Sequence, residues 1–190
     1  MKRLLMAVCA VACVGCTQNT PVRPSATGTG PGDTARHADV AAPQNFGAHL
    51  RGDAEIPPRE TAGQGQAIFK LSRDGSELSY RLIASNIENV VASHIHVGAA
   101  DENGPVVAFL FGAVAPGGGR TNGVLATGTI TGADLIGPLA GQPLSALIEA
   151  MRAGNTYVNV HTNDGVDPIN TGAGDFPGGE IRGQIRVNGH

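Results

Sequence analysis

Apolar residues recur at every second position in short runs between Phe46 and Val187, and turns rich in glycine and proline separate these runs. Such alternation is typical of β-strands that bury one face. Between two of the runs, Asp74-Gly75 suits the positive φ angles of a tight hairpin turn. The pattern predicts an all-β fold, a Greek-key β-sandwich or barrel of about eight strands. We expect these strands at residues 48–55, 66–71, 78–82, 90–97, 106–111, 124–130, 156–162 and 180–187.

One segment has helical spacing instead. Pro143 opens it, and Gly154 stands where a C-terminal cap is expected. We predict one short helix that covers an open end or edge of the sheet, with its apolar stripe packed into the core. The stripe consists of Leu144, Leu147, Ile148 and Met151.

The first sixteen residues, MKRLLMAVCAVACVGC, have the build of a secretory signal, because two basic residues precede an apolar stretch that is too short to span a membrane. The segment Cys13-Val14-Gly15-Cys16 resembles the lipobox of bacterial lipoproteins, with Cys13 in place of the usual leucine. The resemblance implies a signal peptide at residues 1–15 and lipidation of Cys16, which becomes the new N-terminus. The alternative is an ordinary signal peptide that is cut nearby and leaves a free thiol.

Export of this kind predicts an extracytoplasmic protein that is held to a membrane by its lipid, on the periplasmic side or at the cell surface. Thr17 after the cysteine is compatible with sorting to the outer membrane of a Gram-negative host. Residues 16–43 are rich in Thr, Pro, Gly and Ala and lack an apolar period, so we expect a flexible tether to a domain at residues 44–190.

Cysteine use and charge limit the partners and the sources of stability. All three cysteines precede residue 17, so the mature domain has no disulfide and depends on its own core. The chain has 13 basic and 16 acidic residues, and loss of Lys2 and Arg3 with the leader leaves 11 against 16, a net charge of −5. A mildly acidic chain without a basic stripe argues against nucleic acid as a partner.

Four motifs follow one another along the predicted domain: LRGDAEIPP at 50–58, SHIHVG at 93–98, YVNVHT at 157–162 and GGEIRGQ at 178–184. Together they resemble the CHRD domain, a module first noted in chordin and widespread in bacterial secreted proteins, over residues 46–187. The resemblance implies an extracytoplasmic β domain of the immunoglobulin-like or a related barrel type, with no agreed biochemical activity.

The chain departs from that family between its third and fourth motifs, where only a few residues usually intervene. Here residues 163–176 form a longer loop, which is either an elaborated binding loop or a solvated insertion. Its acidic residues, Asp164, Asp167 and Asp175, do not match a calcium loop of the Asp-x-Asp-x-Asp-Gly kind.

Three histidines form the candidate site. His94 and His96 stand two apart on one predicted strand, so they share a face, and His161 lies on another strand. Period-two spacing places all three opposite the expected core residues Ile95, Val97, Val158 and Val160. If the two strands are close, the imidazoles converge, and three histidine ligands with an open position suit Zn²⁺ or Cu²⁺.

The alternative for these histidines is a polar network with the backbone or with Asn159, Glu180 and Arg182. Glu180 and Arg182 share a strand face, and we expect an ion-paired ladder there. Gly98 and Gly183 are expected to allow close backbone approach or a bulge.

The sequence shows no serine or cysteine nucleophile motif, no phosphate-binding glycine loop and no carboxylate dyad. We therefore expect a lipid-anchored, non-enzymatic binding or structural module for an unknown extracytoplasmic ligand or protein. The alternative function is a copper or zinc protein that uses the three histidines, in metal handling or in a redox reaction.

Overall fold

Nine strands follow one another along residues 44–188, the part of the chain that this computed structural model describes. The strands are β1 Asn45–Arg51, β2 Gln64–Leu71, β3 Leu78–Glu88, β4 Val90–Val97, β5 Val106–Gly112, β6 Arg120–Ile130, β7 Thr156–Thr162, β8 Ile181–Gln184 and β9 Arg186–Val187. The α-helix of this region is α1, Leu144–Arg152, and short 3-10 turns occur at Gly52–Ala54, Gly132–Asp134 and Gly137–Leu139.

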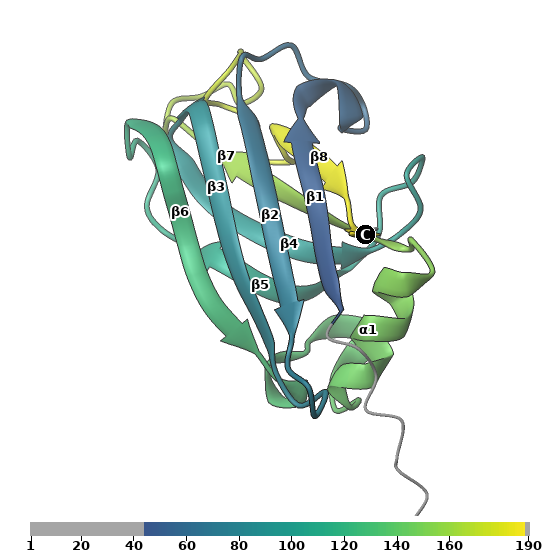
Figure 1. Ribbon diagram of the computed structural model, residues 1–190. Coiled ribbons are helices and arrows are strands. Elements are labelled where there is room, and N and C mark those ends of the chain that lie inside the picture. The colour runs from purple at the N-terminus through teal and green to yellow at the C-terminus, as the bar shows by residue number, and fades with distance from the viewer. Residues whose placement is uncertain (1–43, 189–190) are drawn as a thin grey trace, which may run out of the picture. The chain divides into compact units, whose positions relative to one another are not determined.

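All strand pairs are antiparallel, in the order β5-β4-β7-β8-β1-β2-β3-β6, and the short β9 also pairs with β1. The sheet curls until its two end strands, β5 and β6, contact each other, so it forms a nearly closed barrel. In Figure 1, β1, β2, β3 and β6 make the near wall, and β4, β5 and β7 cross behind them. The predicted all-β class is confirmed, in its barrel form.

The bounds of β4 and β7 are those that the alternation predicts, but the other strands differ from their expected bounds. The strand expected at 48–55 runs from Asn45 to Arg51, because the chain leaves the sheet in a 3-10 turn at Gly52. Strands β3 and β6 are longer than expected, since they stay paired across two register shifts. The last strand is interrupted at Ile185, whose N–H bonds to β7 through the Thr156 carbonyl.

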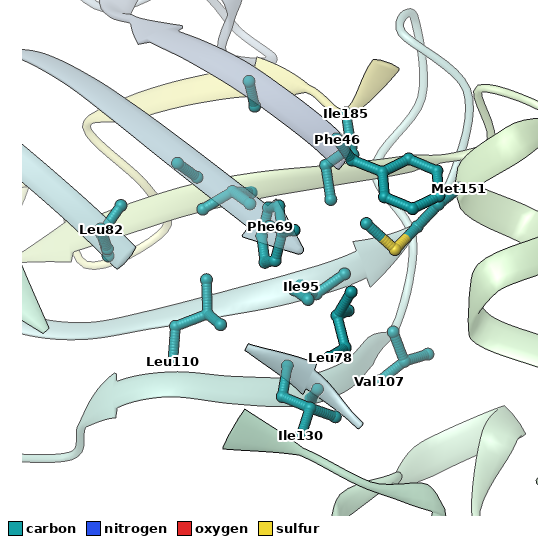
Figure 2. Close-up of a cluster of buried hydrophobic side chains, with 14 of the residues drawn as sticks. Phe46, Phe69, Leu78, Leu82, Ile95, Val107, Leu110, Ile130, Met151 and Ile185 are labelled. Atoms are coloured by element: carbon teal, nitrogen blue, oxygen red, sulfur yellow. The ribbon is translucent and has the colours of Figure 1, made fainter. Parts of the chain in front are cut away.

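The barrel interior holds the hydrophobic core, which side chains from every wall fill (Figure 2). Helix α1 lies beside the end of the barrel at which β1 begins, and all four residues of its apolar stripe are buried, as predicted. Met151 reaches toward Phe46 and Ile185 in Figure 2, so the helix closes this end of the core. Val97, an expected core residue, is only partly buried at its edge.

Within residues 44–188, the structure contains no helix with the length and apolar character needed to cross a membrane. The predicted signal peptide, the predicted lipidation site Cys16 and the predicted tether lie outside the described residues.

Candidate metal centre

Strands β4 and β7 are hydrogen-bonded neighbours, and their register brings the three histidines together. His94 pairs with Asn159 and His96 pairs with Tyr157, while His161 pairs with Ala92. Residues that oppose each other across two strands point to the same side of the sheet. The imidazoles therefore converge on the outer face of the barrel wall, opposite the buried Ile95.

The three imidazoles lie within reach of one small ion. Each histidine offers one ring nitrogen, and these atoms lie within 4.8 Å of one another. His94 Nδ1 and His161 Nε2 are 3.1 Å apart. Two nitrogens on one metal at ~2.0–2.1 Å are separated by no more than about 4 Å. At least one ring must shift slightly to complete coordination.

Two backbone carbonyls fix which ring nitrogen of His96 and of His161 carries a lone pair that can bind a metal. His96 Nδ1 lies 2.8 Å from the Gly104 carbonyl, and His161 Nδ1 lies 2.8 Å from the Pro177 carbonyl. A carbonyl only accepts, so both Nδ1 atoms donate and both Nε2 atoms keep their lone pairs. Histidine ligands of metals are commonly oriented in this way. His96 Nε2 is buried and has no hydrogen-bond partner.

Burial holds the histidines in the neutral form. It lowers the pKa of His94 to about 4, and the neighbouring imidazoles of His161 and His96 contribute to the shift. Burial also lowers the pKa of His96 and of His161. Since only a neutral imidazole binds a metal, the cluster is ready for coordination at neutral pH.

The outer face around the site is a second buried layer, made of polar side chains. Glu180 and Arg182 are both fully buried there, but they do not form the ion-paired ladder expected from the sequence. Arg182 donates to the carbonyls of Ala99 and Glu102 and to Asn103 Oδ1. The ladder prediction is wrong because each of the two charged groups has its own, separate set of hydrogen-bond partners.

The carboxylate of Glu180 has its own set of donors. It accepts hydrogen bonds from the hydroxyls of Thr61 and Thr162 and from the Gly174 N–H. In the part of the chain that the structure describes, the ion pair present is Arg51–Asp53, on the exposed end of β1.

Tyr157 lies between His96 and Arg182 in a three-membered stack. Its ring is 4.7 Å from the His96 ring, at an interplanar angle of 9°. The Arg182 Cζ lies 3.4 Å from the Tyr157 ring centre. The Tyr157 hydroxyl accepts from the Gly104 N–H at 3.0 Å, beside the carbonyl that orients His96. Sequence reasoning missed this stack, although the register of the two strands would have indicated it.

The loop at residues 163–176 contributes to the site through its end rather than through its acids. Its middle is exposed, whereas Gly174 to Phe176 are buried. The Asp175 carboxylate caps Thr171, and the Phe176 N–H donates to the Thr162 hydroxyl. Pro177, directly after the loop, holds His161. None of the loop's acidic residues joins the histidine cluster.

A family model of the CHRD domain matches residues 46–185. The chain belongs to the CHRD-domain family. The match begins at the residue where the resemblance of the four motifs begins, and it confirms that resemblance. In this CHRD domain the motifs converge in space, because the second, third and fourth lie on β4, β7 and β8, which are adjacent in the sheet. Glu55 of the first motif is buried over the same polar layer, beside Gly179. No curated protein matches the chain.

Proposed function

We propose that this CHRD domain binds a transition-metal ion, copper or zinc, and that a lipid on Cys16 anchors it to a membrane outside the cytoplasm. The observation that carries the proposal is that His96 and His161 each turn an unprotonated Nε2 toward the cluster, because a backbone carbonyl holds the Nδ1 atom of each ring, with His94 in reach of both. Imidazole suits copper and zinc, and three such ligands leave one position open.

The setting outside the cytoplasm is supported by residues 1–16, which have the build of a secretory signal and end in a lipobox-like segment. The domain in this proposal is a binding module: it holds the ion and presents its open coordination position. A second candidate is a metal-free module, which the direct His94–His161 hydrogen bond favours, because that bond closes the polar network without an ion.

The test compares the mature chain from Thr17 with a His94→Ala, His96→Ala, His161→Ala variant. Zn²⁺ or Cu²⁺ should raise the melting temperature of the unsubstituted chain. A metal that binds only the folded state, at a hundredfold excess over its dissociation constant, adds about 2.7 kcal/mol to the free energy of unfolding. The triple variant should show no rise, whereas His49→Ala, which removes an exposed histidine from β1, should keep it. A rise that survives the triple substitution, or no rise with either ion, favours the metal-free module.

A further inference from the structure

The donor set carries no negative charge to offset that of a metal ion. Among the described residues, no carboxylate or thiolate joins His94, His96 and His161 at the same spacing. Neutral donors leave the whole charge of the ion in a site that is partly shielded from water, because His96 is buried and His94 and His161 are half-buried. Desolvation penalises charge strongly. The donor set therefore favours an ion of low charge.

A buried guanidinium adds positive charge behind His96. Strand β7 lies between β4 and β8, so the Tyr157 ring separates His96 from Arg182. Arg182 is 1% exposed, and its hydrogen-bond acceptors are neutral carbonyl and amide oxygens. The guanidinium carbon lies within about 8 Å of the His96 ring, where one unit of charge at an effective dielectric of ~20 changes affinity by roughly tenfold.

The other charged groups of this layer carry both signs, but Arg182 is the one that stacks on the Tyr157–His96 pair. Glu180 is a negative group of this layer, and its carboxylate accepts hydrogen bonds from two threonine hydroxyls and a backbone N–H. Burial raises the pKa of Glu55 to about 7, so this side chain carries only part of a negative charge at neutral pH. Arg59 lies over the Phe176 ring and adds a further positive charge.

We infer that the site prefers monovalent copper, Cu(I), to Zn²⁺, and that Arg182, acting through Tyr157, sets this preference. The inference rests on the proposed function, because it concerns the same three histidines. Both ions have a filled d shell, so they differ chiefly in charge and softness. Cu(I) is satisfied by three neutral nitrogens, whereas Zn²⁺ in a three-histidine site takes a fourth ligand. Arg182 is a positioning residue that does not touch the metal.

The experiment measures the ratio of the Cu(I) and Zn²⁺ dissociation constants for the mature chain, by anaerobic competition with a chromogenic chelator for each ion. Cu(I) should bind at least about tenfold more tightly than Zn²⁺. Tighter binding of Zn²⁺ would overturn the inference and leave the proposed function standing. If neither ion binds, or if the triple alanine variant binds both equally well, the proposed function fails as well.

Two substitutions of opposite sign test the role of charge. Arg182→Gln should shift the ratio about tenfold toward Zn²⁺. Glu55→Gln, measured at about pH 8 where most of this carboxyl is charged, should shift it toward Cu(I), because it removes a negative group from the same layer. Arg182→Lys keeps the charge and should restore most of the preference. If Arg182 had a purely structural role, its substitution would weaken the binding of both ions equally and leave the ratio of their dissociation constants unchanged. If Arg182→Gln does not fold, Glu55→Gln decides alone, and an unchanged ratio overturns the inference.

Discussion

Gly183 lies where β8 approaches β1 too closely for any side chain. A Cβ atom at this position would stand 2.2 Å from the carbonyl oxygen of His49. Gly183→Ala must therefore push the two strands apart, and we predict a loss of about 1–3 kcal/mol in the free energy of unfolding, measured with urea. Gly172→Ala is the control, because no atom lies within 4 Å of its Cβ position, and it should stay within about 0.5 kcal/mol. Equal losses would contradict the close approach.

His94 makes the metal-free protein sensitive to acid. Its folded-state pKa is about 4, whereas a histidine in the unfolded chain titrates near ~6.5. Between these values the unfolded state binds more protons, so the free energy of unfolding should fall as the pH drops from about 6.5 to about 4. Urea melts in the presence of a chelator, at several pH values in that window, measure the decline.

Glu55 opposes this decline. Its pKa of about 7 lies above the unfolded value of ~4.3, so the folded state binds more protons between them and gains stability as the pH falls. Glu55→Gln should therefore make the acid decline steeper, and His94→Asn should make it shallower. A decline that neither substitution changes would assign the acid sensitivity to other groups.

At the scale of elements, β4 separates an apolar face from a polar one. Ile95 is fully buried in the barrel, between the two histidines that project outward. Ile95→Ala should lower the free energy of unfolding by about 2–4 kcal/mol, because it leaves a cavity in the core. Lys70→Ala on the exposed face of β2 should change it by less than about 0.5 kcal/mol. A denaturant melt with similar losses for both variants would show that the face assignment of β4 is wrong.

The spacing of apolar residues was sufficient to predict β4 and β7 from alternation and α1 from helical periodicity, and to place the three histidines on one side of the sheet. It assigned each side chain to a face, but it could not say what covers the second face. The loops that bury Arg182 and Glu180 come from sequence positions up to about 120 residues away, such as Thr61. The His96 and His161 rings are oriented by the backbone carbonyls of Gly104 and Pro177. Every residue has such a carbonyl, so the orientation of the rings could not be predicted from the sequence.

At the scale of the whole molecule, the proposed lipid anchor on Cys16 would determine where the site works. Cys16 follows a lipobox-like triplet and is the one cysteine that cleavage before it retains. We predict that Cys16→Ser gives an unprocessed or soluble protein, which fractionation of cells followed by immunoblotting detects. A Thr17→Ala variant serves as the control and should remain processed and membrane-bound. Recovery of the fully processed Cys16→Ser protein in the membrane fraction would refute the anchor.

The order of the strands has a consequence for how the chain acquires its native state. Strand β8 lies near the C-terminus and is therefore among the last segments to be synthesised. In the sheet it lies between β7 and β1, where Arg182 pairs with Arg51. The barrel therefore has a high contact order, and such topologies fold slowly because distant segments must meet before contacts stabilise them. In the export that we propose, we expect the chain to stay unfolded until residue 182 has passed through the translocation channel. The ligand set would then be assembled only after the whole domain has left the cytoplasm, and metals inside the cell would meet no finished site.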